Sequence, residues 1–262
     1  MLTVKHTDRR LWEAGMILRQ FLHTDPVAIS YLFGCGGHAA CAVVDPVGDI
    51  APYLRVADNT GMRIRFVIDT HIHADHHSAG RALAREAGAE YVLYAGADVA
   101  FPFRPVKDGD RLPLGNVVVD VMHTPGHTPE HICLLVTDRT RADEPWFVLT
   151  GHTLMVGDVG RTELVDDPAN GALTLFVSLQ RLKALPDHIE VLPGAYAGSV
   201  CGRRLSGKPS STIGFERRHN AAFRIDPADE FVEFMLQDIP PPPVGAAELR
   251  AWNSGQYTGA AQ

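Results

Sequence analysis

Seven short runs rich in β-branched and aromatic residues fill the first two-thirds of the chain, and they constrain its fold more than any other feature. The runs are YLFG, CAVVDP, RIRFVID, YVLYAG, VVVDVMHTPG, HICLLVTD and WFVLTG, each bounded by Gly, Pro or Asp. Such runs predict strands. Helical patterns at 49–57 and 78–87 lie between some of them. The sequence therefore predicts a strand-rich α/β layout with helices outside.

The last third of the chain predicts three helices and one strand, and one of these helices lies at the end of the otherwise irregular segment 195–220. Apolar residues recur on one side of the segment 168–185, which is typical of an amphipathic helix. The strand IEVLPG follows, and PADEFVEFMLQ predicts the last helix. IPPPPVG predicts a stiff tail, because proline can continue neither a helix nor a central strand. We expect one domain over residues 1–238 and a Pro-rich tail over 239–262.

Charge and hydropathy exclude two classes of partner. The 262 residues carry a formal net charge of -7, whereas a nucleic acid or an anionic membrane requires a dominant basic surface. No apolar run approaches the roughly 20 residues of a membrane-spanning helix. The first residues lack the apolar core of a signal peptide. The expectation is a cytoplasmic protein with no nucleic-acid or membrane partner.

The four cysteines lie far apart and form no C-x-x-C pair. This spacing predicts neither a zinc ribbon nor a disulfide framework. Cys35, Cys41 and Cys133 are expected to be small buried thiols. The role of Cys201 is left open.

A histidine-rich stretch, THIHADHH, directly follows a predicted strand. His71 and His73 are two residues apart, so both side chains project to the same side of an extended segment. Asp75 and His76 follow in the turn. Three imidazoles and a carboxylate in six residues are typical of a metal site. The alternative is a solvated histidine-rich turn.

A second histidine stretch, TPGHTPEH, lies about fifty residues further along the chain. Its Pro-Gly turn comes at the end of a predicted strand and is expected to direct the ring of His127 toward the first cluster. A lone histidine at such a turn is more often on the surface. Together with H-x-H-x-D-H, however, it indicates the second half of one metal site.

The segments THIHADH, TPGHTPEH and TGHTLMVGDVGR resemble, in order and spacing, the motifs of the metallo-β-lactamase superfamily. More narrowly, SYLFG, VVDP, GDVGRTEL and AGSVCGRRLSGKPSSTIGFERRHN are similar to segments of the bacterial persulfide dioxygenases. These relatives of glyoxalase II oxidise glutathione persulfide. The similarity extends to about Phe223 and implies an α+β protein, an αββα sandwich with the metal at one edge between two sheets.

The resemblance also implies a cofactor and partners. Persulfide dioxygenases hold one ferrous ion, Fe(II), and the residues here that match two of its ligands are His71 and His127. The expected partners are a small-molecule thiol or persulfide and dioxygen, and a homodimer is compatible with the family. Zn(II) is the alternative metal.

Two positions depart from the family pattern. The motif T-G-D reads Thr150-Gly151-His152, and the motif P-G-H reads Pro193-Gly194-Ala195. A bridging carboxylate and a second-site histidine are therefore missing, which disfavours a di-zinc hydrolase. The sequence predicts about one metal on a face formed by His71, His127 and His152, with His73 as a supporting member of the site. Three histidines suit iron and zinc equally.

Other polar residues are candidates for roles around the metal. Asp75 and His76 are expected to orient rings and a water. The hydroxyl of Tyr196 is a candidate donor to a metal-bound ligand, with packing as the competing explanation. The candidates for substrate binding are Arg161, Cys201, Arg203 and Arg204, since guanidinium groups recognise carboxylates such as those of glutathione. Taken individually, each arginine of the segment 203–218 is better explained as a solvated surface charge, whereas Arg161 is expected to have a structural role or to line the mouth of the site.

These observations favour a mononuclear iron dioxygenase that converts a glutathione persulfide-type substrate to sulfite and a thiol. The first alternative is a zinc hydrolase of a thioester or lactone, with metal-bound hydroxide as the nucleophile. The second is a relative that binds metal or substrate with altered or no catalysis, because His152 replaces the family carboxylate.

Overall fold

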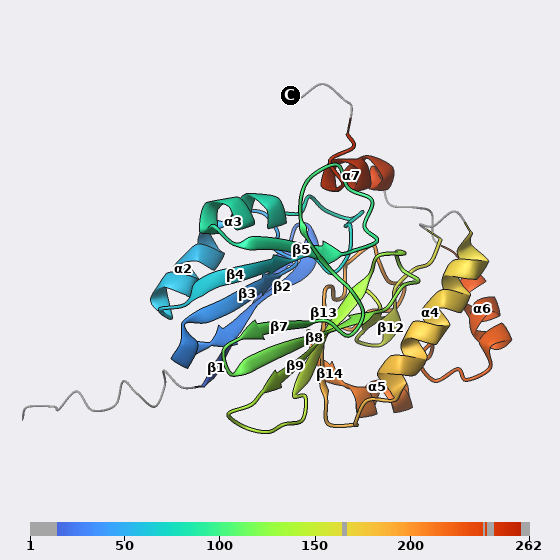
Figure 1. Cartoon of the computed structure of the whole chain (residues 1–262). Helices are drawn as coiled ribbons and strands as arrows, with labels where there is room; N and C mark the ends of the chain where they lie inside the picture. The colour runs from blue at the N-terminus through green and yellow to red at the C-terminus, as the bar shows by residue number, and fades with distance from the viewer. Residues whose placement is uncertain (1–14, 164–166, 238, 240–243, 258–262) are drawn as a thin grey trace, which may run out of the picture.

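In a computed structural model of the chain, residues 15–163, 167–237, 239 and 244–257 are described. These residues form two six-stranded sheets that face each other (Figure 1). The first sheet has the order β1 (Met16–Thr24), β2 (Val27–Cys35), β3 (Ala40–Val44), β4 (Arg63–Ile68), β5 (Glu90–Tyr94) and β6 (Arg104–Val106). The second has the order β14 (Ser211–Thr212), β13 (Glu190–Pro193), β10 (Phe147–Gly151), β9 (Ile132–Asp138), β8 (Val117–His123) and β7 (Arg111–Leu114).

Both sheets mix parallel and antiparallel pairs. Strands β1 to β3 are antiparallel neighbours, whereas β3 to β6 run parallel. In the second sheet β7 to β10 are antiparallel, β10 pairs with β13 in parallel, and β14 is antiparallel to β13. A two-stranded ribbon of β11 (Leu154–Met155) and β12 (Asp158–Val159) follows β10.

Helices cover the outer faces of the two sheets. The first sheet carries α2 (Ala51–Asn59) and α3 (Gly80–Ala87), and a short 3-10 helix, η1 (Gly36–His38), joins β2 to β3. The second sheet carries α4 (Pro168–Lys183), α5 (Ile213–His219) and α6 (Ala228–Leu236) (Figure 1). A last helix, α7 (Ala246–Asn253), lies at the end of the sandwich near α3. The expected α+β class and αββα sandwich are confirmed.

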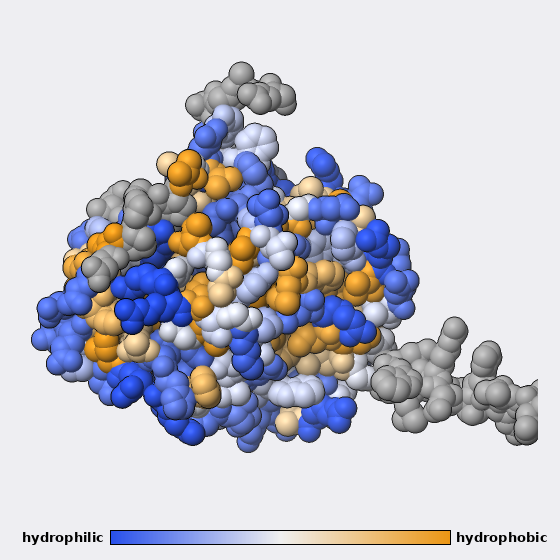
Figure 2. Space-filling view, turned by 180° about the vertical axis from the view of Figure 1, so that it is seen from behind, coloured by the Kyte–Doolittle hydropathy of each residue, from blue (hydrophilic) through white to orange (hydrophobic). Residues whose placement is uncertain are grey.

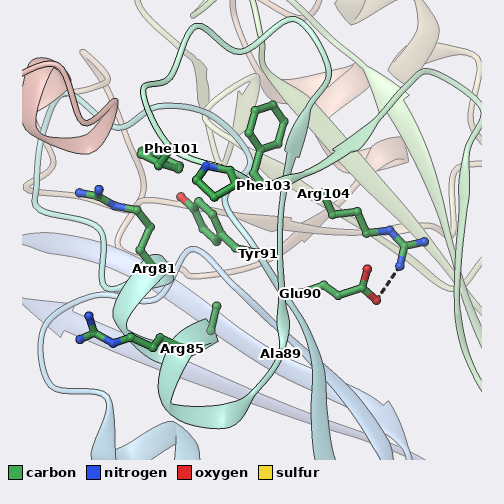
Figure 3. Close-up of a pocket in the computed structure, with 10 residues that line it drawn as sticks. Arg81, Arg85, Ala89, Glu90, Tyr91, Phe101, Phe103 and Arg104 are labelled. Carbon is green, nitrogen blue, oxygen red and sulfur yellow. Dashed lines mark hydrogen bonds and ion pairs between the residues drawn. The ribbon is translucent and has the colours of Figure 1, made fainter.

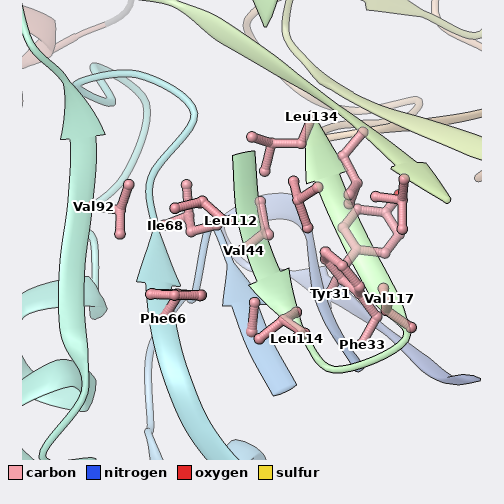
Figure 4. Close-up of a cluster of buried hydrophobic side chains, with 14 of the residues drawn as sticks. Tyr31, Phe33, Val44, Phe66, Ile68, Val92, Leu112, Leu114, Val117 and Leu134 are labelled. Carbon is pink, nitrogen blue, oxygen red and sulfur yellow. The ribbon is translucent and has the colours of Figure 1, made fainter. Parts of the chain in front are cut away.

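Three apolar clusters correspond to the three interfaces between these four layers. The largest fills the space between the sheets and includes Tyr31, Phe33, Phe66 and Leu134 (Figure 4). A second lies between the second sheet and helices α4 and α6, and a third between the first sheet and helices α2 and α3. The hydroxyl of Tyr31 donates to the carbonyl of Pro193 at 2.7 Å, so a polar contact also joins the two sheets.

Most predicted elements are present. Helices α2, α3 and α4 occupy the segments with helical periodicity, and the strand predicted at VVVDVMHTPG is β8, which forms a hairpin with β7. The prediction that PADEFVEFMLQ is the last helix is wrong, because α7 follows the proline run. The prolines 240–243, for which a stiff tail was predicted, lie outside the described residues, and AAELRAWN after them consists mainly of good helix formers. Residues 246–253 of the predicted tail are therefore helical, while the domain boundary at 238 stays a prediction.

The surface is mixed in character. On the face shown in Figure 2, hydrophobic side chains form several patches separated by hydrophilic ones. None of the helices that the described residues form is long and apolar enough to cross a membrane.

Candidate metal centre

Three strand ends from both sheets meet at one edge of the sandwich. The loop after β4 carries His71 and His73, the turn after β8 carries His127, and His152 directly follows β10. Glycine permits the turns before two of these histidines. Gly126 has φ 138°, and a Cβ there would lie 2.4 Å from the Cα of Leu175. The backbone therefore approaches α4 in a way that a larger residue would prevent.

The side chains of His71, His127 and His152 form a compact, buried group. Their ring centroids are 5.0 Å apart for His71 and His127, 4.7 Å for His71 and His152, and 5.1 Å for His127 and His152. One ring nitrogen from each lies within 4.8 Å of the others. Each residue is about 1% exposed. The predicted three-histidine face is therefore assembled as one site.

Hydrogen bonds to the backbone and to threonine orient these rings. The Nδ1 atom of His127 donates to the carbonyl of Arg161 at 2.8 Å, which leaves Nε2 as an acceptor, 3.3 Å from Nδ1 of His152. The Nδ1 atom of His71 lies 2.9 Å from the hydroxyl of Thr70. The Nε2 atoms of His71 and His152 have no hydrogen-bond partner although both are buried. Buried polar atoms without partners are costly, and a metal ion among these nitrogens would satisfy them.

Burial keeps the three imidazoles in the form that binds metal. Desolvation, followed by the neighbouring histidines, holds the pKa of His71 well below its usual value. Desolvation lowers the pKa of His127 to about 3, with His152 as the next cause. Desolvation also lowers the pKa of His152 to about 4, although Asp75 opposes it. At neutral pH all three rings are uncharged, which is the ligand state.

A consequence of these shifts is that the metal-free protein should lose stability in acid. The unfolded chain takes up protons near pH 6.5 at positions 127 and 152, whereas the folded chain does not until about pH 3 to 4. Stability is therefore full above pH 6.5 and falls as the pH drops through this window. At pH 5 the loss is about 2 kcal/mol for each histidine. Urea denaturation of chelator-treated protein between pH 7.5 and 5 measures it, and His127→Asn should weaken the pH dependence. An unchanged unfolding free energy over this range would contradict the neutral, buried state.

His73 has a different environment from the other three. Its Nε2 lies 3.2 Å from Oδ1 of Asp45. Burial alone would lower the pKa of His73, but the hydrogen bond and charge of Asp45 raise it well above the usual value. Asp45 also accepts bonds from the N–H and hydroxyl of Thr70, at 2.7 and 2.9 Å. His73 thus forms an ion pair beside the three-histidine group, where it suits the supporting role expected from the sequence.

Asp75 lies beside both His152 and His76, and Cys201 lies near Asp75 and His152. Oδ2 of Asp75 is 4.0 Å from Nε2 of His152, and Oδ1 is 3.1 Å from Nδ1 of His76. The carboxylate oxygens of Asp75 have no hydrogen-bond partner. Ligand atoms of Asp75, His152 and Cys201 lie within 4.8 Å of one another. Burial and then Asp75 raise the pKa of the Cys201 thiol well above its usual value. Cys201 is thus part of the site.

A pocket of about 490 Å³ opens beside this cluster, and Asp75 and His76 line it. The buried side chains of His71, His127 and His152 are not among its lining residues, so Asp75 and His76 lie between the pocket and the three-histidine group.

A family model of the metallo-beta-lactamase superfamily matches residues 27–194, which include every histidine of this centre. The chain belongs to the metallo-beta-lactamase superfamily. It is 30% identical to a hydroxyacylglutathione hydrolase of Rhodospirillum rubrum, over 76% of this chain and 83% of that protein. It is 27% identical to the human mitochondrial persulfide dioxygenase ETHE1, over 85% of this chain and 81% of that protein.

Two solved structures extend the comparison. A metallo-beta-lactamase from Staphylococcus aureus superposes with a TM-score of 0.88 at 34% identity, covering 95% of this chain and 75% of that one. The structure of ETHE1 from Myxococcus xanthus gives a TM-score of 0.78 at 29% identity, covering 92% of this chain and 99% of that one. Members of the superfamily are metal-dependent enzymes. The histidine group described above is therefore a candidate metal-binding site of the kind expected for this superfamily.

The arginines proposed to bind substrate all contact the protein itself. The guanidinium of Arg161 pairs with Glu163 and donates to the carbonyl of Val200 at 3.0 Å. Arg203 lies 4.9 Å from the ring centroid of Phe234 and donates to the carbonyl of that residue. Arg204 is exposed, and its N–H donates to the carboxylate of Asp158. Their role in substrate binding stays a prediction that these contacts do not support.

Tyr196 is half-buried against the core between the sheets. Its hydroxyl donates to the carbonyl of His23 at 2.8 Å. This bond uses the one proton of the hydroxyl, so the geometry favours packing over the predicted donation to a metal-bound ligand.

Several residues of the centre were missed by the sequence reasoning. His131 stacks on His71 with centroids 4.9 Å apart, and its Nε2 accepts a bond from the N–H of His152 at 3.0 Å. It lies within TPGHTPEH, so the motif contained the signal. The carboxylate of Glu130 accepts from the N–H of Ile72 at 2.9 Å, so it joins the loop that carries His71 to the loop that carries His127.

Helix α7 supports the loop that carries His71, His73 and His76. The side-chain amide of Asn253 donates to the carbonyls of His73 and His76 at 2.8 and 2.7 Å and accepts from the N–H of Ser78 at 2.9 Å. Arg250 pairs with Glu130 at 3.2 Å. No local sequence pattern signals these contacts, because they join segments about 120 to 180 residues apart.

Asn253→Ala should weaken both the fold and the metal site. The substitution leaves buried carbonyls and one N–H without partners, which should reduce the free energy of unfolding by about 2 to 4 kcal/mol. The loosened loop should lower metal affinity by about 10-fold or more, as loss of supporting contacts typically does. Denaturant titration and cobalt binding measure the two effects. Gln256→Ala, at an exposed residue just beyond α7, is the matched control. Unchanged cobalt affinity in Asn253→Ala would show that α7 does not position the loop.

Proposed function

We propose that the protein is a mononuclear Fe(II) dioxygenase that oxidises a low-molecular-weight, glutathione persulfide-type substrate. The balanced reaction is R–S–SH + O2 + H2O → R–SH + sulfite + 2 H⁺. The outer sulfur is oxidised, the S–S bond breaks, and dioxygen is reduced. The observation that carries the proposal is the convergence of three neutral, buried imidazoles from His71, His127 and His152. The similarity to persulfide dioxygenase ETHE1 along most of the chain supports it.

The described residues suit this chemistry in three ways. The three histidines would hold the ion, and Thr70 and the carbonyl of Arg161 fix the direction of two of the rings. Bound Fe(II) would supply the electrons and the open coordination positions that activate dioxygen. Since three neutral imidazoles leave the full formal charge of about +2 on the ion, the site favours an anionic sulfur.

Residues beside the histidines are placed to handle protons and exclude water. Asp75 and His76 line the pocket, and Oδ1 of Asp75 lies 3.1 Å from Nδ1 of His76, so the imidazole of His76 would accept the proton that a persulfide loses on binding. Cys201 and His131 fill the remaining space around His152 and His71. This burial shelters the reaction from bulk solvent.

A second candidate function is a zinc hydrolase. It is favoured by the 30% identity to a hydroxyacylglutathione hydrolase, and by the fact that three histidines and a water also describe a hydrolytic zinc site. In that case the substrate would be a thioester or lactone.

Oxygen uptake separates the two functions. Protein purified without oxygen and loaded with Fe(II) should consume dioxygen with a thiol persulfide and release an equal amount of sulfite. It should consume little with the corresponding thiol, because the outer sulfur of a persulfide is more acidic and more nucleophilic. His219→Ala, at an exposed histidine, is the control for His127→Ala, which should be inactive. No persulfide-dependent uptake, together with thioester hydrolysis by zinc-loaded protein, would establish the second function instead.

A further inference from the structure

The pocket beside the metal centre has a distinctive charge. Its lining includes the carboxylates of Asp25, Asp49 and Asp75, and no lysine or arginine is among the described residues that form it. His23 also lines it, and burial lowers the pKa of that imidazole, so it adds no positive charge at neutral pH. The pocket therefore presents a negative field to an entering molecule.

A second hollow continues this surface over α7. The two hollows share His77 and Leu249, and the second is lined by Glu248, Trp252 and Tyr257 as well. The ring of His77 meets Trp252 edge-on, with centroids 5.3 Å apart. An aromatic face next to carboxylates is an arrangement that attracts ammonium groups.

An unpartnered buried acceptor lies at the inner end of the pocket. The side chain of Asp75 is 3% exposed, and neither of its carboxylate oxygens has a hydrogen-bond partner. Asp75 therefore places a carboxylate at the inner end of the pocket, 3.1 Å from Nδ1 of His76 and 3.7 Å from Nδ1 of His73.

Arginines do gather elsewhere on the molecule, but away from this centre. Arg81, Arg85 and Arg104 line a pocket between α3, β5 and β6 together with Tyr91 and Phe101 (Figure 3). That pocket contains none of the candidate metal-site residues. It therefore offers no cation to a molecule bound at the histidines.

We propose that the site selects thiol persulfides that carry a protonated amino group, and disfavours those whose remaining charges are carboxylates. This inference rests on the proposed function. The sulfur end of such a substrate is anionic and faces a metal of formal charge about +2. The ammonium end would face the carboxylates of Asp25 and Asp49, which line the pocket. A carboxylate in place of the ammonium group would meet like charge, and no lysine or arginine is among the described residues that line the pocket.

Three persulfides of similar length test the selectivity. They are the persulfides of cysteamine, N-acetylcysteamine and 3-mercaptopropionate, which carry an ammonium, a neutral amide and a carboxylate. We expect kcat/KM for oxygen uptake to fall in that order, by about tenfold or more between the extremes. Because the pocket is open to solvent, the ratio should shrink in 0.5 M salt. Equal or greater kcat/KM for the 3-mercaptopropionate persulfide would overturn the proposal.

The substitution Asp49→Asn tests whether the carboxylate of Asp49 contributes to the preference for an ammonium group. Asp49 is exposed, and its carboxylate accepts from the N–H of Ala51, a bond that asparagine can keep. The variant should lose about fivefold in kcat/KM for the cysteamine persulfide, the size of one partly exposed ion pair, and little for the N-acetyl compound. Asp58→Asn, at an exposed residue of α2 outside the pocket, is the matched control and should change neither. Equal losses for both substrates, or the same loss in the control, would count against the proposal.

A binding measurement keeps this inference separate from the proposed function. Cysteamine and 3-mercaptopropionate are titrated into cobalt-loaded protein, and the visible spectrum of the cobalt reports binding. Tighter binding of cysteamine would support the charge selectivity even if no persulfide is oxidised, in which case only the proposed function fails. Tighter binding of 3-mercaptopropionate would overturn the selectivity, whatever the outcome of the oxygen assay.

Discussion

Replacement of His71 or His127 by alanine should remove most of the bound metal from the protein. Each histidine is one of three buried ligands, and two remaining imidazoles cannot hold the ion against dialysis. We expect affinity to fall by more than about 100-fold, beyond the usual effect of losing a supporting contact. Elemental analysis after dialysis measures the loss.

The control for this experiment is His219→Ala, which changes an exposed histidine on α5 and should retain full metal content. Circular dichroism verifies that the alanine variants still fold. Retention of metal by both folded variants would show that the ligands lie elsewhere, with Asp75, His152 and Cys201 as the next group to test.

His152→Asp should increase iron occupancy and dioxygenase activity. The substitution restores the family carboxylate and lowers the formal charge at Fe(II) from about +2 to about +1, which strengthens ferrous binding and eases electron donation to dioxygen. With ordinary pKa values, an aspartate ligand would also keep the metal to lower pH than a histidine would. The structure does not support this additional effect. Burial already lowers the pKa of His152 to about 4, close to that of a free aspartate.

His152→Asn is the matched control, because it has the size of aspartate without its charge. Iron per chain and kcat/KM for persulfide oxidation are compared among the three proteins. If the aspartate variant loses metal and activity while the parent protein is a competent dioxygenase, His152 is a purpose-built ligand. The view that it weakens the family chemistry is then wrong.

The layers of the fold could be predicted because their signals are local. The β-branched runs bounded by Gly, Pro or Asp form strands in the structure, and the segment 168–185, which has a leucine periodicity, contains α4. Strand β1 gave a weaker signal, since it lies at a sheet edge and is only partly buried. Helix α7 was missed although AAELRAWN consists mainly of good helix formers, and its position depends on contacts of Arg250 and Asn253 with distant loops.

In the candidate site, too, the residues with local sequence signals could be predicted and those that depend on distant contacts could not. His71, His127 and His152 follow strand ends in recognisable motifs, so their convergence could be predicted. The contacts of Asp45 with His73, and of Cys201 with Asp75, arise from tertiary packing that spacing does not reveal. The basic residues after position 200 suggested an anion site, but Arg203 packs on Phe234 and Arg217 pairs with Asp187. The presence of basic residues in a sequence does not show whether their side chains will bind a ligand or pair with other residues of the protein.

The metal content of protein expressed and purified without oxygen tests the central claim most directly. The three-histidine group should hold one iron per chain, because His152 and Ala195 stand where the family has its bridging carboxylate and its second-site histidine. Two tightly held metals per chain, or one zinc and no iron, would contradict a mononuclear iron centre.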